Sequence, residues 1–379
     1  MSGPLAGVRV LELAALGPVP FGVMLLADLG ADVVRVDRVS SVASPGFEAT
    51  MRGLSRGRRS IAVDLKAAEG LSILMRLIED ADVLVEGFRP GVLERLGVGP
   101  DVCLERNPRL IVARTTGWGQ DGPLADRAGH DIDYAAVAGA LHPVGSADRP
   151  PPPPLNMLAD FGGGGAFLAI GVLAALLERE RSGQGQVIDV AMVDGTAVLT
   201  TFFHGLMALG AWTTERESNL LDGAAPFYRC YATSDGAAIA VGCIEPQFYA
   251  AFLERLELPA EQWPQHDRAL WPAQSAALAR LFATRTRAEW EQVFADSDAC
   301  VAPVLALDEA PRHPHNQARE VFTEAFGMVQ PAPAPRFART PGELTLPPPD
   351  PGADTDTILG ELGFDTEQVA RLRASGAVA

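Results

Sequence analysis

The sequence predicts an α/β protein in which a large domain with a parallel sheet precedes a smaller α+β domain. Its 379 residues are enough for two domains. A strand–helix–strand pattern opens the chain, and strands and helices keep alternating to residue 192. Near Asp222 the pattern changes to short strands separated by turns, which indicates a second domain.

The first of these patterns is a βαβ unit. Residues 8–13 read as a buried strand, residues 21–29 as a helix that stops at Gly30, and residues 31–36 as a second strand. Two prolines and a glycine within residues 14–20 predict a loop. A strand, a helix and a strand so close together indicate parallel pairing. The GxGxxG signature is absent from the first turn, so the unit does not favour NAD binding.

The alternation then leads to a glycine-rich loop and a histidine. We expect helices at residues 67–80 and 92–96 and strands at residues 83–87 and 110–114. Residues 115–123 contain three glycines and follow the last of these strands directly. Ligands bind at such strand ends in open α/β sheets. His130, which follows the loop, is therefore a candidate catalytic residue.

A run of five prolines at residues 150–154 leads to Asp160, near the start of a helix that we expect to reach residue 181. An aspartate there either caps the helix or serves as a carboxylate beside N–H groups that stabilise an anion. The glycines at 162–165 indicate close packing against a neighbouring element or a substrate, since no Walker motif follows. Residues 187–192 predict a strand, and residues 193–212 a long apolar helix that leaves the domain.

The second domain begins with a hairpin. Apolar runs at residues 226–232 and 237–242 flank an Asp-Gly turn, which is a strong hairpin signal. Glu245 follows, and Pro246 is suited to be the first residue of a helix that reaches residue 256. Residues 331–351 are rich in proline, and residues 354–372 predict one or two short helices.

Composition excludes several classes of function. A net charge of −17 disfavours nucleic-acid binding. The four cysteines form no CxxC pair, and no His or Cys cluster has metal-ligand spacing, so we expect neither disulfides nor a metal site. We expect a cytoplasmic protein, because no signal peptide and no apolar run long enough to span a membrane is evident; the strongest candidate, residues 166–177, is too short.

Basic residues gather in the first half of the large domain. The group consists of Arg35, Arg38, Arg56, Arg58, Arg59, Lys66, Arg89 and Arg95. Arginine suits phosphate groups because its planar fork binds two oxygens. Ordinary surface charge explains the same spacing, and spacing alone slightly favours it. The remaining histidines, and Asp131 and Asp133, read as structural, capping or surface groups.

Several motifs together resemble the family III CoA-transferases, also called the CaiB/BaiF family. The resemblance rests on residues 3–13, 29–37, 64–66, 86–91, 117–123, 128–134, 160–164, 222–228 and 241–249. It implies a Rossmann-like large domain at residues 1–192, to which residues 331–379 return, a linker helix at 193–223 and a small domain at 224–330. It also implies an interlocked homodimer. Residues 41–55 depart from the family pattern, with residues 44–47 as a small insertion.

The resemblance also implies a site and a reaction. CoA would lie on the large domain near Arg38, Val63, Lys66, Arg89 and Arg95. In the transferases of this family the aspartate at position 160 is the acyl-carrying nucleophile, whereas the racemases have the histidine at position 130 and the glutamate at position 245.

This chain has both of the racemase residues, His130 and Glu245, together with Asp160. We therefore expect a racemase that inverts the α-carbon of 2-methylacyl-CoA thioesters by proton transfer through an enolate. His130, steadied by Glu245, and Asp160 would be the two proton carriers. The CoA belongs to the substrate, and no separate cofactor is expected. A transferase and a non-catalytic acyl-CoA-binding protein are the alternatives.

Overall fold

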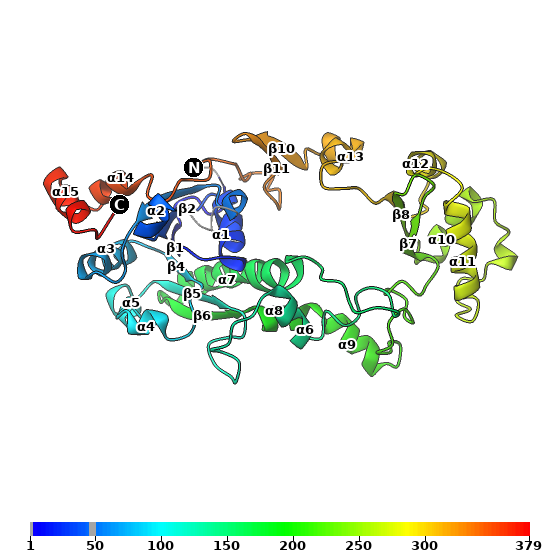
Figure 1. Cartoon of the computed structure of the whole chain (residues 1–379), viewed down its shortest axis with the longest axis horizontal. Coiled ribbons are helices and arrows are strands. Elements are labelled where there is room, and N and C mark those ends of the chain that lie inside the picture. The colour runs from blue at the N-terminus through cyan, green and yellow to red at the C-terminus, as the bar shows by residue number, and fades with distance from the viewer. Residues whose placement is uncertain (1–2, 45–50) are drawn as a thin grey trace. The chain divides into compact units, whose positions relative to one another are not determined.

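A computed structural model describes residues 3–44 and 51–379 (Figure 1). The chain divides into two compact units. The large unit contains residues 1–140, 154–200 and 322–379, and the small unit contains residues 141–153 and 201–321. The small unit is thus an insertion in the large one. Most of the predicted insertion at residues 44–47 lies outside the described residues.

The large unit is built on a six-stranded parallel sheet with the order β3-β2-β1-β4-β5-β6. This is the doubly wound arrangement, in which the direction of winding reverses between β1 and β4. The strands are β1 (Arg9–Leu13), β2 (Asp32–Asp37), β3 (Arg58–Ala62), β4 (Val83–Glu86), β5 (Ile111–Thr116) and β6 (Gln186–Ala191).

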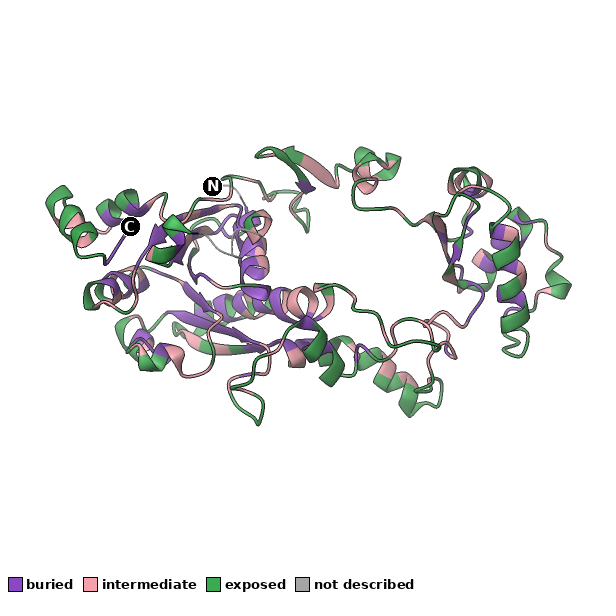
Figure 2. Ribbon diagram, in the orientation of Figure 1, coloured by how far each residue is buried: buried purple, intermediate pink, exposed green. Residues whose placement is uncertain are grey.

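Helices cover both faces of this sheet, because alternate residues of the central strands are apolar on each face. One face packs against α1 (Pro18–Asp28) and α7 (Phe167–Ser182). The other packs against α3 (Ala68–Glu79), α4 (Val92–Arg95), α5 (Pro100–Arg106), α14 (Thr355–Glu361) and α15 (Thr366–Ala374). The strands and the inner sides of α1 and α7 hold the buried core (Figure 2).

Shorter elements complete the large unit. They are α2 (Val39–Ala43), α6 (Asp131–Val137), the π-helix η2 (Met157–Ala166), α8 (Met192–Leu199) and the hairpin of β10 (Phe322–Ala325) and β11 (Met328–Pro331). Residues after 340 run back along the sheet. The Asp354 carboxylate accepts the Ser60 N–H at 2.8 Å, and Val378 forms a β-bridge with Val63.

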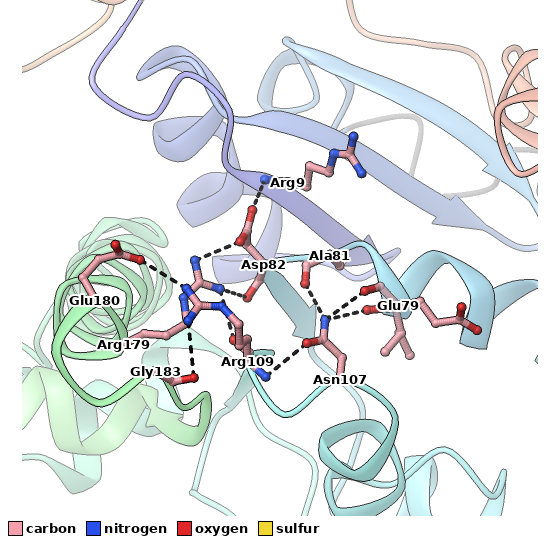
Figure 3. A network of polar contacts seen from close by, with 10 residues as sticks. Arg9, Glu79, Ala81, Asp82, Asn107, Arg109, Arg179, Glu180 and Gly183 are labelled. Carbon is pink, nitrogen blue, oxygen red and sulfur yellow. Dashed lines mark hydrogen bonds and ion pairs between the residues drawn. The ribbon is translucent and has the colours of Figure 1, made fainter.

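A polar network ties the amino-terminal ends of β1, β4 and β5 to α7 (Figure 3). Asp82 accepts the backbone N–H of Arg9 at 2.8 Å and the Arg179 guanidinium at 2.8 Å. Asn107 donates to the carbonyl oxygens of Ile78 and Ala81. These bonds fix the amino-terminal ends of the strands, whereas ligands of open α/β sheets bind at the carboxyl ends.

The small unit contains a three-stranded antiparallel sheet in the order β7-β8-β9. The predicted hairpin is confirmed, with a turn at residues 233–236. An aromatic core that includes Phe227, Phe252, Trp271 and Phe282 fills the unit. Its elements are α9 (Thr201–Ala208), β7 (Tyr228–Ala232), β8 (Ala238–Gly242), α10 (Pro246–Arg255), η3 (Ala260–Gln262), α11 (Trp271–Phe282), α12 (Arg287–Phe294), β9 (Val301–Pro303), η4 (Ala310–Arg312) and α13 (Pro314–Ala318).

Several boundaries differ from the sequence prediction. Helix α1 begins at Pro18, within the predicted loop, because proline is accepted in the first turn of a helix. Strand β3 and helix α5 were not predicted. The single helix predicted at 193–212 breaks at Thr200 into α8 and α9, and the units divide there. The chain returns to the large unit at residue 322 rather than 331.

The helix that follows the proline run is longer than predicted. Helices η2 and α7 form one continuous helix over Met157–Ser182, which is long and apolar enough to span a membrane by length and composition alone. The prediction that no such segment exists is therefore wrong. Leu168 and Val172 of this helix are fully buried against the sheet, as in the core helix of a globular unit.

Candidate active site

The candidate site lies at the point where the winding of the sheet reverses. The loops after β1 and β4 leave in opposite directions there, and such divergence opens a crevice for ligands. Gly17, in the loop after β1, lies beside the carboxylate of Asp160: a Cβ at this glycine would be 3.1 Å from Asp160 Oδ2. Because Gly17 also has a φ of 68°, only glycine suits this position.

Asp160 is not a helix cap, so the capping prediction is wrong. It is the fourth residue of η2, whose N-cap is Asn156. The Asn156 side chain donates to Asp160 Oδ2 at 3.3 Å. Burial raises the pKa of the Asp160 carboxyl, and the charge of Asp131 raises it further, while Asn156 and His130 lower it; the net shift is upward. A carboxyl with a raised pKa is suited to accept and return protons.

His130 is the exposed N-cap residue of α6. Its backbone N–H donates to Asp133 at 2.9 Å, which fixes the start of the helix and confirms the capping prediction for Asp133. The residue that follows His130, Asp131, accepts the backbone N–H of Asp160 at 2.8 Å, and the charge of His130 lowers the pKa of the Asp160 carboxyl. The structure therefore brings together two of the three predicted catalytic residues.

Tyr134 was not predicted as a site residue, yet it is central to this region. Its ring packs edge-on against Trp118 at 4.8 Å, and Gly117 and Gly129 leave room for it. Burial raises the pKa of Tyr134 to about 12, with Asp160 and Asp133 adding to the shift and Arg89 opposing it. The glycine-rich loop and α6 are thus held together by one aromatic side chain.

The four glycines at 162–165 have the structural role that was predicted for them. A Cβ at Gly163 would lie 2.4 Å from Thr196 Oγ1 on α8, and a Cβ at Gly165 would lie 2.6 Å from the ring of Phe21 on α1. Helices α1 and α8 therefore approach the backbone of η2 from both sides. Asp160 sits in a segment whose path is fixed by close packing.

A pocket of about 540 Å³ opens at the carboxyl ends of β1, β2 and β3. Three of the residues predicted to bind CoA, Arg38, Val63 and Lys66, line it together. They meet because the ends of parallel strands share one edge of the sheet. Phe88 and Gly376 also contribute to the lining, and the sequence did not point to either.

Arg89 and Arg95 do not line this pocket, and their contact with CoA stays a prediction. The charge of Arg89 instead lowers the pKa of Tyr134. The loop that contains Arg89 is anchored by Glu86, which accepts the Phe88 N–H at 2.6 Å and the guanidinium of Arg114 at 2.8 Å.

Other members of the basic group are engaged in ion pairs. Arg56 pairs with Asp28 at 2.6 Å, and Arg58 pairs with Glu12 at 2.5 Å; all four residues are buried. Arg35 pairs with Asp37 at 2.9 Å. These arginines are buried in ion pairs and are therefore not surface charges.

Glu245 belongs to the small unit. It is the exposed N-cap residue of α10, and Pro246 is the first helical residue, as predicted. Its carboxylate raises the pKa of the Cys300 thiol, although burial contributes more. Its predicted role beside His130 stays a prediction. Within residues 3–44 and 51–379, no group of three or more His, Cys, Asp or Glu side chains is arranged to hold a metal ion.

Comparison with known proteins adds to this geometry. A family model described as CoA-transferase family III matches residues 5–355. The chain is 48% identical to an α-methylacyl-CoA racemase of Mus musculus over 373 residues, which cover 98% of this chain and 96% of the relative. It is 45% identical to an α-methylacyl-CoA racemase of Homo sapiens with the same coverage. A crystal structure of a CaiB/BaiF family protein from Brucella suis superposes with a TM-score of 0.81 and 26% identity, covering 96% of this chain and 100% of that one.

Proposed function

Because the chain belongs to CoA-transferase family III, we infer that it is a racemase that inverts the α-carbon of 2-methylacyl-CoA thioesters. The observation that supports this most strongly is its near full-length identity, 48%, with a racemase of the same family. The position of His130 supports it independently, because the next residue, Asp131, accepts the backbone N–H of Asp160 at 2.8 Å, and inversion needs one proton carrier for each face of the carbon.

The proposed reaction exchanges one proton. The thioester carbonyl acidifies the hydrogen on the α-carbon, and one of the two side chains removes it to give an enolate. The other side chain returns a proton to the opposite face. Burial raises the pKa of Asp160, which favours proton transfer to and from this carboxyl. A backbone amide near the start of η2 would stabilise the enolate oxygen. No step requires electron transfer.

The function is tested by incubating a single enantiomer of a 2-methylacyl-CoA with the enzyme in D2O. We expect deuterium at the α-carbon together with loss of chirality, measured by NMR and chiral chromatography. Transfer of CoA to an added free acid, with a hydroxamate formed on Asp160 when hydroxylamine is added, would instead show a transferase. Tight binding without either reaction would show a binding protein and would exclude the racemase.

The pocket at the ends of β1, β2 and β3 is proposed to hold the CoA moiety. Replacing Arg38 with alanine is expected to raise KM for the thioester about 10-fold or more, because a hydrogen bond from a charged group contributes about 1.5–3 kcal/mol. The value of kcat should stay near that of the wild type, since such binding is alike in ground and transition states.

Arg9→Ala is the control for this prediction. Arg9 is an exposed arginine at the amino-terminal end of β1, and it is not among the residues that line the pocket. Initial rates measured over a range of thioester concentrations distinguish the two variants. An unchanged KM for Arg38→Ala would remove Arg38 from the site.

We further propose that the protein is a cytoplasmic homodimer whose chains interlock, with Glu245 steadying His130 in the assembled enzyme. Helix α9 is consistent with a dimer interface. It is mostly apolar, and none of its residues is buried among the described residues. Phe202 in this helix and Leu209, which follows it, are 60% and 82% exposed. Sedimentation equilibrium should give twice the mass of one chain, and a monomer that is fully active would exclude the proposal.

A further inference from the structure

Asp131, the residue that follows His130, links the two proposed proton carriers, His130 and Asp160, through hydrogen bonds of its side chain. Asp131 is the first residue of α6 and only 5% exposed. Its Oδ2 atom accepts the backbone N–H of Ala159 at 2.6 Å and that of Asp160 at 2.8 Å. One end of this residue is therefore bonded covalently to His130, and the other holds the backbone of Asp160.

This contact caps η2 from outside. The first turns of a helix have N–H groups without partners inside the helix, and in a π-helix the bonds reach five residues along. The N-cap of η2, Asn156, makes no side-chain capping bond and instead donates to the Asp160 carboxylate. Asp131 supplies the acceptor for two of these N–H groups, and its negative charge suits the positive end of the helix.

The burial of Asp131 has a cost in the free energy of folding, which accompanies its hydrogen bonds to Ala159 and Asp160. Its second oxygen, Oδ1, is buried without a hydrogen-bond partner in the part of the chain that the structure describes. A buried carboxylate that lacks one of its partners costs free energy. An apolar residue would avoid this cost.

We propose that Asp131 is a positioning residue for proton transfer, which fixes the Asp160 carboxyl relative to His130 by accepting the N–H groups of Ala159 and Asp160. The proposal rests on the proposed racemase reaction and deepens it. Two helices that begin at different points of the chain, α6 and η2, each supply one proton carrier. The hydrogen bonds of Asp131 hold the starts of these two helices in a fixed position relative to each other.

Electrostatics gives Asp131 a second effect on the same carboxyl. Burial is the first cause of the raised pKa of Asp160, and the charge of Asp131 adds to it. The ionisable groups of the elements packed against η2 are His130, Asp131, Asp133 and Tyr134 on α6, Asp28 on α1, Glu178, Arg179, Glu180 and Arg181 on α7, Asp194 on α8 and Asp189 on β6. Of these, Asp131 raises the pKa of Asp160 and His130 lowers it. Asp194 instead raises the pKa of Asp189, and Asp28 forms an ion pair with Arg56.

Two substitutions separate position from charge. Asp131→Asn keeps an oxygen that accepts both N–H groups, while its amide nitrogen takes the place of the unpartnered Oδ1. Asp131→Ala removes the charge and both hydrogen bonds. We expect Asp131→Ala to lower kcat about 100-fold, the scale for displacing a reacting group by about 1 Å, with KM nearly unchanged. Asp131→Asn should lose less activity.

The pH profile distinguishes positioning from a merely structural role. In the direction in which Asp160 removes the proton, the acidic limb of kcat/KM reports its pKa. Losing the Asp131 charge lowers that pKa, so the acidic limb of Asp131→Asn should move to lower pH. Asp126→Asn, the same change at an exposed aspartate in the preceding loop, should leave the profile where it is. A limb that stays in place in Asp131→Asn would refute the electrostatic effect.

A second measurement does not depend on activity. Hydrogen–deuterium exchange of the amides of Ala159 and Asp160 should speed up in Asp131→Ala and stay slow in Asp131→Asn. Equal protection in both variants would overturn the positioning role, whatever the enzyme catalyses. Failure of the wild type to exchange the α-hydrogen in D2O would instead refute the proposed reaction, so the two failures are distinguishable.

Discussion

Replacing His130 with alanine, or Asp160 with asparagine, should reduce racemisation at least about 100-fold, the usual scale for the loss of a general acid or base. The effect should be equal for both enantiomers. Each turnover uses both groups, one to remove the proton and one to return it, and exchanging the two substrates only exchanges their roles. The rate of chirality loss, measured from each pure enantiomer, checks this prediction.

The loss of activity in both variants should appear in kcat rather than in KM. Both side chains lie outside the pocket at the ends of β1, β2 and β3, so KM for the thioester should change little. Asp160→Asn keeps the shape of the side chain beside Gly17, so the close packing of η2 should survive. Circular dichroism and thermal unfolding provide the control for folding. A folded variant of either residue that still racemises at a near-normal rate would show that the residue is not a proton carrier.

Replacing Arg58 with alanine should destabilise the large unit by about 3–5 kcal/mol, the cost of leaving a buried charge without its partner. Arg58 is 1% exposed and bonds Glu12, itself 1% exposed, at 2.5 Å. It also donates to the carbonyl oxygens of Pro20, Leu54 and Arg56, so the substitution removes four partners at once. The midpoint of urea unfolding measures the loss.

Two further variants test this explanation. Arg58→Met with Glu12→Leu removes both charges, and it should recover much of the stability because no unpaired charge remains. Recovery should be incomplete, since the three carbonyl oxygens that accepted from Arg58 still lack that donor. Arg9→Ala breaks an exposed pair with Asp80, in which the side chains are 60% and 72% exposed, and should change stability by no more than about 1 kcal/mol. Similar effects of Arg58→Ala and Arg9→Ala would contradict the argument.

The sequence predicted strands best where most residues of a run are apolar and buried. Residues 8–13, 83–87 and 110–114 are such runs, and each became a strand. Strand β3 was missed because Arg58 and Arg59 read as surface charges. Arg58 is buried only because Glu12, on another strand, lies within reach. A pairing between residues 46 positions apart leaves no mark on local periodicity.

The candidate site shows the same limit. One of the two readings of Asp160 was a cap of its own helix, but the cap comes from Asp131 on another helix. The importance of Tyr134 follows from the glycines on either side of its ring, at positions 117 and 129, which only the folded chain brings together. The meeting of Arg38, Val63 and Lys66 could be anticipated, since the ends of parallel strands share an edge.

The outer edge of β3 links the order of synthesis to the order of folding. The N–H of Ser60 is satisfied by Asp354, which lies 294 positions further along the chain, and the N–H of Ala62 by Thr355. At about 5–20 residues per second, the ribosome needs roughly 15–60 s to bridge that interval. During this time the nascent sheet has an unpaired edge strand, the kind of surface that recruits other chains. Arg59, which pairs with Glu361 once that residue has been made, places a positive charge on this strand and would discourage such pairing until the edge is covered.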